Sequence, residues 1–218
     1  MKMYEFLILQ ICNPQRKYMN ILRMLFSVTF AYLTGCVNAA LIYSKLIKHT
    51  DIRSYGSGNA GSTNVLRIYG LKPALCVFLF DCLKGFAAVK AAAFINTAQA
   101  CPLAVSVCAV AVVCGHNWPI FTQYRGGKGV ATTFGAGLAL VPEVALCALG
   151  LAIALVLITK IVSVGTVGAV CSAALWIIIT KHPLYECATF AALAVLCVWR
   201  HAENIKRILN GTENKLEF

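Results

Sequence analysis

The chain has 218 residues and a formal net charge of +11, with 60% hydrophobic and only 12% charged residues. Its long uncharged runs exclude a soluble fold with a single core and indicate a protein that crosses a membrane several times. The runs are continuous and do not alternate, so they predict an all-α membrane protein and exclude a transmembrane β-barrel. We expect no nucleic-acid partner, because in a membrane protein the excess charge marks cytoplasmic loops and anionic ligands.

The chain divides into an N-terminal extension, residues 1–23, and a single membrane domain, residues 24–218. Tyr4–Cys12 is apolar but only nine residues long, too short to cross a bilayer, and no small-residue cleavage site follows it. We therefore expect either an interfacial tail or a start site further on, at Met19 or Met24. The first span is Met24–Ser44, an uncharged run of 21 residues.

The loop after this span contains the polar stretch GSGNAGSTNVLR, Gly56–Arg67. Glycines allow backbone N–H groups to converge, hydroxyls and amides add donors, and Arg67 adds a fixed charge, so the stretch suits an anion. An ordinary glycine-rich turn would look the same. The pattern is neither the dinucleotide fingerprint nor a P-loop. Basic residues around it place the loop in the cytoplasm.

The second span is Pro73–Ile95, where Asp81 and Lys84 share one helix face. Charges at this depth are costly and should face the bundle or its cytoplasmic cavity. A structural ion pair is the favoured interpretation over a direct catalytic role. The eleven cysteines lie singly in apolar runs without metal-ligand spacing, so we expect no disulfide framework, metal site or cofactor.

The third span, Ala100–His116, leads to a second polar stretch, GHNWPIFTQYRGGKGVATTFG, Gly115–Gly135. Here Arg125 and Lys128 flank a double glycine, which predicts a second anion cradle, although a plain basic loop would look similar. His116 is expected to hold this loop and not to act as a base.

The apolar run Val130–Thr159 is interrupted at Pro142, which predicts a hairpin of two short crossings. Ile161–Thr180 and Leu184–Trp199 complete seven spans, with the N-terminus outside and the C-terminus cytoplasmic. This topology places twelve of the nineteen Lys and Arg residues in cytoplasmic loops or the tail, although four in residues 1–23 contradict it.

The tail holds a third polar stretch, RHAENIKRILNGTENK, Arg200–Lys215. His201 and Asn204 are three residues apart and can face the same site, while Asn210 and Gly211 predict the end of a helix. Alone, the tail would be interpreted as an amphipathic segment on anionic lipid. Three polar stretches at one membrane face favour a shared site instead.

The three stretches together resemble the signature motifs of the bacterial acyl-phosphate-dependent glycerol-3-phosphate acyltransferase (PlsY) family, from about Met24 to the C-terminus. The resemblance implies a seven-helix enzyme of the bacterial inner membrane with its active site at the cytoplasmic face. Such an enzyme transfers an acyl group from acyl phosphate to the 1-hydroxyl of glycerol 3-phosphate, giving lysophosphatidic acid and phosphate, without acyl-CoA. Its partners are these two substrates, membrane lipid and a separate peripheral enzyme that supplies acyl phosphate.

The resemblance also implies the site. The implied catalytic residues are His201, Asn204, Arg67 and Lys128, and the implied substrate-binding residues are Ser57, Gly58, Asn59, Thr63, Asn64, Gly126, Gly127 and Ser163. Because acyl phosphate is already activated, no nucleophilic Cys or Ser is required. The proton of the hydroxyl could go to His201 or to a substrate phosphate oxygen, and the negative charge beside His201 favours the second route.

The chain departs from the usual family pattern at Cys36, Asn38, Ser62 and Ala202, of which Asn38 requires an internal hydrogen-bond partner. Two other classes of function remain. A transporter for organic phosphates would place its motifs at the midplane and show an inverted repeat, and neither is seen. A lipid-binding scaffold explains the basic tail but not His201 and Asn204 beside two glycine-rich loops.

Overall fold

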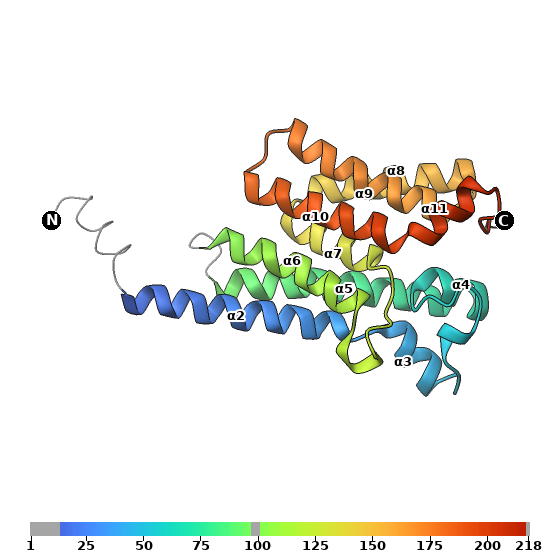
Figure 1. Cartoon of the computed structure of the whole chain (residues 1–218), viewed down its shortest axis with the longest axis horizontal. Helices are drawn as coiled ribbons and strands as arrows, with labels where there is room; N and C mark the ends of the chain where they lie inside the picture. The colour runs from blue at the N-terminus through green and yellow to red at the C-terminus, as the bar shows by residue number, and fades with distance from the viewer. Residues whose placement is uncertain (1–13, 97–100, 217–218) are drawn as a thin grey trace.

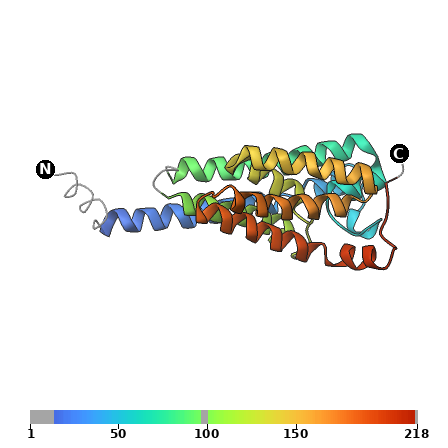
Figure 2. The same cartoon turned by 90° about the horizontal axis from the view of Figure 1, so that it is seen from above.

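A computed structural model describes residues 14–96 and 101–216, so the apolar segment Tyr4–Cys12 lies outside the described residues. The described residues form helices and no strands, and the long helices lie side by side in an elongated bundle (Figures 1 and 2). The helices are α2 (Pro14–Cys36), α3 (Ala39–Leu46), η1 (Ile52–Ser54), α4 (Ser62–Tyr69), α5 (Leu71–Ile95), α6 (Pro102–Asn117), η2 (Ile120–Thr122), α7 (Val130–Leu140), α8 (Pro142–Thr159), α9 (Val162–Ile179), α10 (Leu184–Arg200) and α11 (Ala202–Leu209).

Several of these helices suit a bilayer. Within the described part of the chain, four segments are long and apolar enough to cross a membrane, namely Tyr18–Leu46, Pro102–Thr122, Pro142–Thr159 and Val162–Ile179. Helix α7 is apolar but has only 11 residues, and α10 has 17. Helix α5 is long enough, with 25 residues, but it carries both Asp81 and Lys84. The prediction of an all-helical membrane protein is therefore consistent with the structure.

The first span differs from the prediction at both ends. Helix α2 begins at Pro14, ten residues before Met24, so residues 14–23 are continuous with the first span. It ends at Cys36, and Asn38 caps the next helix by accepting a hydrogen bond from the Leu41 N–H (3.0 Å). The Asn38 amide also donates to the Ala60 carbonyl at 3.1 Å. The partner that Asn38 was expected to need is therefore present, and it lies in the first polar loop.

The hairpin predicted at Pro142 is confirmed. Helix α7 ends at Leu140 and α8 begins at Pro142, a position where the missing proline N–H costs nothing. The segment that follows α8 lies near the start of α7, because Val162 and Val130 line one cavity. The tail lies there too, since Leu216 donates its N–H to the Lys160 carbonyl at 2.8 Å. The same tail reaches α9 through the Ser163–Glu213 hydrogen bond.

Glycines allow two pairs of helices to approach closely. A Cβ on Gly115 of α6 would lie 2.0 Å from the Tyr32 carbonyl oxygen of α2, and one on Gly135 of α7 would lie 1.9 Å from the Cys82 carbonyl oxygen of α5. Small residues at helix contacts are the usual means of packing helices in membranes. These contacts fix the bundle beneath the polar loops.

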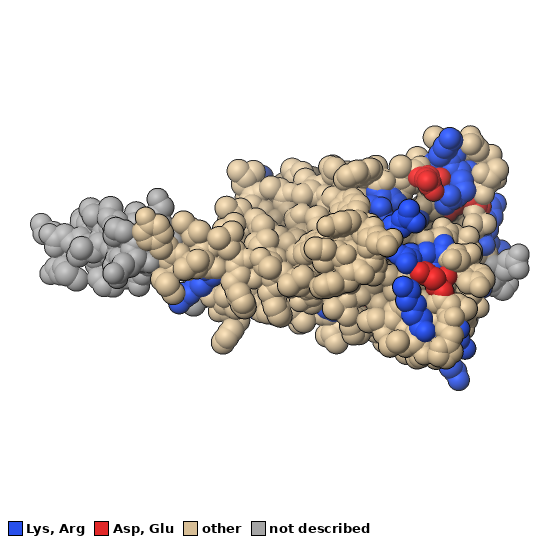
Figure 3. Space-filling model, turned by 60° about the horizontal axis from the view of Figure 1, so that its bottom comes forward, with Lys and Arg blue, Asp and Glu red and all other residues tan. Residues whose placement is uncertain are grey.

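The polar loops and α11 gather at one end of the bundle. Figure 3 shows Lys and Arg side chains concentrated there, whereas the middle of the visible face carries few charges. Contacts between distant segments bring the polar stretches together: Arg53, three residues before the first stretch, bonds to carbonyls of Thr122 and Arg125 in the second, and Lys128 in the second bonds to Asn204 in the third.

Candidate functional site

Two cavities lie at the polar end. The large cavity, about 700 Å³, is lined mainly by polar and charged residues of the loops and α11. The small cavity, about 340 Å³, combines polar loop residues with apolar residues of α4, α5 and α7. The residues that line both are Ser57, Asn59, Lys128 and Asn204. All four were candidates from the sequence, so the two cavities share a wall made of predicted site residues.

Most of the remaining candidates also line a cavity. The small cavity includes Thr63, Arg67, Ser163 and His201, and the large one includes Gly58 and Gly126. Asn64 and Gly127 line neither of them.

Asn64 shapes the first loop from within the protein. Its side chain is only 1% exposed, accepts from the Ser57 N–H at 2.9 Å, and donates to the carbonyls of Ile52 and Tyr55 at 3.2 and 3.0 Å. The turn around it requires a positive φ of 58° at Gly56. Asn64 therefore holds Ser57 at the cavity wall and shapes the first loop from within the protein.

The double glycine in the second loop is needed for packing. A Cβ on Gly126 would lie 2.0 Å from the His116 carbonyl oxygen, and one on Gly127 would lie 2.1 Å from His116 Nε2. The N–H groups of Gly126 and Gly127 donate to the carbonyls of Asn117 and His116 at 3.2 and 3.1 Å. These two N–H groups are thus occupied within the protein, which differs from the anion cradle expected from the sequence.

Lys128 is the central cation of the shared wall. Its ammonium group donates to Asn204 Oδ1. Burial lowers the pKa of Lys128 to about 8, with neighbouring arginines acting in the same direction and Glu213 opposing them. An amine with this pKa is mostly protonated at pH 7 and can bind a phosphate, but it loses its charge in mildly alkaline solution.

This pKa predicts a pH dependence for substrate binding. The charged form of Lys128 exists below its pKa, so kcat/KM for a phosphate substrate should fall as the pH rises through about 8. In Lys128→Arg the guanidinium stays charged, so the fall should disappear from whatever activity remains. Initial rates between pH 6.5 and 9.5 test this, and an unchanged alkaline fall in the arginine variant would contradict it.

His201 is held as a neutral ring with one nitrogen available. Its Nδ1 donates to the Cys197 carbonyl at 2.8 Å, which leaves the lone pair on Nε2, 3.5 Å from Thr166 Oγ1. Burial, followed by the Lys128 charge, lowers the pKa of His201 to about 4. In the unliganded protein His201 is therefore a hydrogen-bond acceptor at the small cavity, and an anionic ligand would raise its pKa.

Glu213 was not identified from the sequence, although it connects several candidates. Its buried carboxylate accepts from Ser163 Oγ at 3.1 Å, Asn204 Nδ2 at 2.6 Å and Arg207 Nε at 2.7 Å. The chain reaches this point by turning back after Gly211, which has a φ of 70°. A Glu among the charged residues of the tail gives no pattern to recognise; the signal lies in its position just after a predicted helix end.

We expect Glu213→Ala to leave three buried or half-buried donors without their acceptor. Each hydrogen bond to a charged group contributes about 1.5–3 kcal/mol, so the variant should unfold at a lower temperature and lose at least about tenfold in activity. Glu203→Ala is the matched control, because Glu203 also faces Arg207, at 3.9 Å, but its side chain is 93% exposed. Thermal unfolding in detergent, together with initial rates, measures both effects, and equal losses in the two variants would contradict the role of Glu213.

The buried pair on α5 has the geometry of a structural pair. Lys84 Nζ lies 2.7 Å from Asp81 Oδ1, 2.9 Å from His116 Nδ1 and 2.7 Å from the Val37 carbonyl oxygen. These contacts join α5 to the end of α6 and to the break between α2 and α3. Asp81 and His116 also line the small cavity. His116 thereby holds the second loop in place, since the glycines pack directly against it.

Comparisons with known proteins all match this chain to the same protein family. The family model described as "Glycerol-3-phosphate acyltransferase" matches residues 25–211. A protein of that name from Thermoanaerobacter sp. (strain X514) is 43% identical over 188 residues, covering 85% of this chain and 92% of its own. Another, from Clostridioides difficile (strain 630), is 43% identical over 205 residues, covering 91% and 98%.

Two solved structures are similar in fold and sequence. Both are crystal structures of PlsY (YgiH), an integral membrane glycerol 3-phosphate acyltransferase. The glycerol 3-phosphate form matches with a TM-score of 0.84 and 35% identity, covering 89% of this chain and 96% of the other. The lysophosphatidic acid form matches with a TM-score of 0.81 and 34% identity, covering 89% and 95%.

Proposed function

The chain belongs to the glycerol-3-phosphate acyltransferase family, and from this we propose that it transfers a fatty acyl group from acyl phosphate to the sn-1 hydroxyl of glycerol 3-phosphate. The products are lysophosphatidic acid and inorganic phosphate. This is the first acylation step in bacterial phospholipid synthesis.

The composition of the small cavity carries this proposal. One part of its wall is apolar and comes from α4 and α5, with the residues Leu66, Leu71, Ala74, Leu75 and Phe78. The other part carries Arg67, Lys128 and His201. A cavity lined by both cations and apolar residues suits a molecule with a phosphate head and an acyl chain.

The reaction needs alignment of two substrates more than covalent help from the protein. The hydroxyl oxygen attacks the acyl carbonyl carbon, the bond from that carbon to the phosphate oxygen breaks, and phosphate leaves with the bonding electrons. Lys128 and Arg67 stabilise the negative charge on the carbonyl oxygen and the departing phosphate. The two head groups are oriented by neutral donors and acceptors, namely Ser57, Asn59, Thr63, Ser163 and Asn204.

The hydroxyl proton has two possible acceptors, and we favour a phosphate oxygen of the substrate. His201 presents a free Nε2 lone pair, but a pKa of about 4 makes it a weak base before the substrates bind. When two phosphate dianions arrive, the pKa of His201 rises and the protonated ring becomes a phosphate ligand. With a phosphate oxygen of the substrate as the proton acceptor, the reaction needs no base from the protein.

We further propose seven crossings of the bacterial inner membrane, formed by α2 with α3, α5, α6, α7, α8, α9 and α10. The N-terminus lies outside, and the C-terminus and the two cavities lie at the cytoplasmic face. Residues 24–218 act as one domain. The concentration of Lys and Arg at the loop end supports this orientation. A peripheral enzyme that makes acyl phosphate would be the functional partner at that face.

The choice of donor is tested with the purified protein and two donors of the same chain length. We expect labelled glycerol 3-phosphate to be acylated by palmitoyl phosphate and not by palmitoyl-CoA. Acyl phosphate carries its phosphate directly on the acyl carbonyl, within reach of the cations of the cavity wall, whereas the phosphates of acyl-CoA lie far from its thioester. Transfer from palmitoyl-CoA at a comparable rate would overturn the proposed donor while leaving the family assignment in place.

A further inference from the structure

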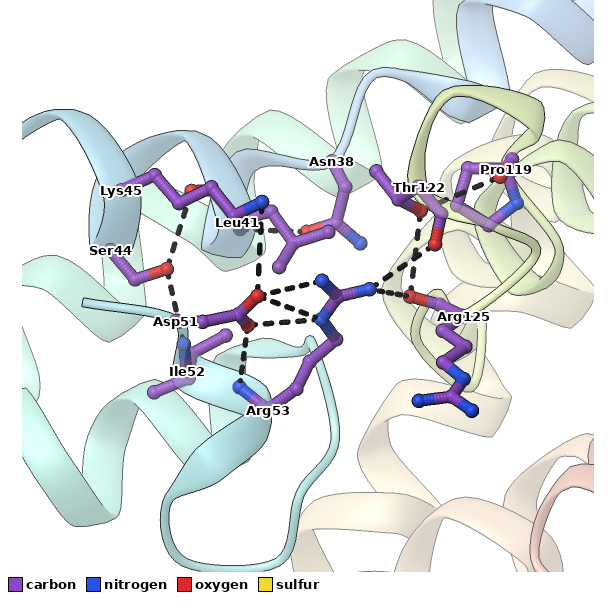
Figure 4. A network of polar contacts seen from close by, with 10 residues as sticks. All are labelled: Asn38, Leu41, Ser44, Lys45, Asp51, Ile52, Arg53, Pro119, Thr122 and Arg125. Atoms are coloured by element: carbon purple, nitrogen blue, oxygen red, sulfur yellow. Dashed lines mark hydrogen bonds and ion pairs between the residues drawn. The ribbon is translucent and has the colours of Figure 1, made fainter. Parts of the chain in front are cut away.

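Arg53 joins two loops that are far apart in the sequence. Its guanidinium forms a two-pronged contact with Asp51, with Nε 2.9 Å from Oδ1 and Nη2 2.6 Å from Oδ2. Its third nitrogen, Nη1, donates to the carbonyls of Thr122 and Arg125 at 3.2 and 3.3 Å. Figure 4 shows the Arg53 side chain between Asp51 on one side and these two carbonyls on the other.

The loops on either side of Arg53 carry the shared wall of the two cavities. Arg53 lies four residues before Ser57, and the carbonyls that it contacts belong to the segment that continues through the double glycine to Lys128. Among the side-chain hydrogen bonds of residues 14–96 and 101–216, those from Arg53 join these two loops directly. Arg53 therefore links the loop of Ser57 to the loop of Lys128.

The contact is charged and partly shielded from water. The side chains of Arg53 and Asp51 are 23% and 29% exposed. Hydrogen bonding from Arg53 holds the pKa of Asp51 at about 2, so the carboxylate stays ionised throughout the physiological range. A planar guanidinium is the side chain that can hold a carboxylate with two nitrogens and still donate to two carbonyls.

We propose that Arg53, fixed by Asp51, is a positioning residue for acyl transfer that holds the loop bearing Ser57 and Asn59 against the loop bearing Lys128. This proposal rests on the proposed function. Arg53 acts through the spacing of the head-group ligands, and a displacement of about 1 Å in such ligands can reduce a rate about 100-fold.

Arg53 also lines the large cavity, so direct binding of a phosphate is the competing explanation. The Asp51→Asn variant distinguishes the two explanations, because the positioning role predicts a change in kcat and phosphate binding predicts a change in KM. The asparagine oxygen can still accept from the Arg53 N–H, as Asp51 Oδ1 does at 3.0 Å, so the local turn is retained. If Arg53 positions the loops, weakening its anchor lowers kcat. If Arg53 binds phosphate, removing the competing carboxylate lowers KM for the phosphate substrate.

The experiment compares wild type, Arg53→Ala, Arg53→Lys and Asp51→Asn, with Lys45→Ala as the matched control. Lys45 is another cation near Asp51, at 3.7 Å, and it contacts neither Thr122 nor Arg125 in the described network. We expect kcat to fall about 10- to 100-fold in Arg53→Ala, with Arg53→Lys and Asp51→Asn between it and wild type. Lys45→Ala should stay within about twofold of wild type.

Hydrogen exchange supplies a readout that does not depend on activity. In Arg53→Ala the amides of residues 120–126 should exchange faster, although they lie about 70 residues from the substitution. The hydrogen-exchange measurement still tests the contact between Arg53 and the second loop if the proposed acyl donor proves wrong. Unchanged exchange in residues 120–126, or a lower KM with unchanged kcat in Asp51→Asn, would overturn the positioning role.

Discussion

Replacing Lys128 by alanine should reduce kcat for acyl transfer by about 100- to 1,000-fold, the loss usual when one donor to a developing negative charge is removed. Lys128 is one of the four residues that line both cavities, and its ammonium group contacts Asn204. The alanine variant therefore loses the cation in the wall that the two cavities share. Single-turnover rates with saturating substrates separate this effect from weaker binding.

Lys206→Ala is the control for Lys128→Ala. Lys206 lies on α11 at the same end of the bundle, is exposed, and lines neither cavity. Its removal changes the net charge equally and should leave kcat within about twofold of wild type. A Lys128→Ala variant that folds normally and keeps more than a third of wild-type kcat would exclude Lys128 from catalysis.

Gly127→Ala should nearly abolish activity even though Gly127 lines neither cavity. The added Cβ would lie 2.1 Å from His116 Nε2 and 2.8 Å from the Ala60 carbonyl oxygen, closer than real Cβ contacts allow. His116 is fully packed and contacts the buried ammonium of Lys84, so it has little room to move. We expect a loss of stability of about 1–3 kcal/mol from overpacking and a fall of about 100-fold in kcat, because Lys128 follows directly.

Gly150→Ala provides the comparison for this variant. Gly150 lies in α8, and a Cβ added there would meet no atom within 4 Å. Thermal midpoints and initial rates of the two variants should therefore differ sharply, with Gly150→Ala close to wild type. If Gly127→Ala retained wild-type activity and stability, the packing role assigned to the double glycine would be wrong.

The overall organisation could be predicted from the sequence because it follows from strong local signals. Pro142 interrupts an apolar run too long for one span, and the structure places the break there. The meeting of the three polar stretches also followed from the alternation of spans. The start of α2 could not be predicted, because the basic residues before Met24 suggested a tail, whereas α2 begins at Pro14.

The details of the site depended on contacts that no local pattern encodes. Glycine serves equally for a positive φ, for close packing or for an exposed N–H, and the sequence does not distinguish these uses. Gly126 and Gly127 proved to be packing positions with occupied N–H groups. Glu213 and Arg53 were missed for a related reason, since each also contacts a residue 50 or more positions away, Ser163 and Thr122 respectively.

Measuring both products of one reaction is the most direct test of the proposed acyl transfer. Purified protein in lipid nanodiscs is given palmitoyl phosphate and labelled glycerol 3-phosphate, and lysophosphatidic acid and inorganic phosphate are quantified together. We expect the two to appear in equal amounts, and neither to form above background with Arg67→Ala. Binding of glycerol 3-phosphate without any lysophosphatidic acid, or phosphate release without acylation, would contradict the proposed transfer.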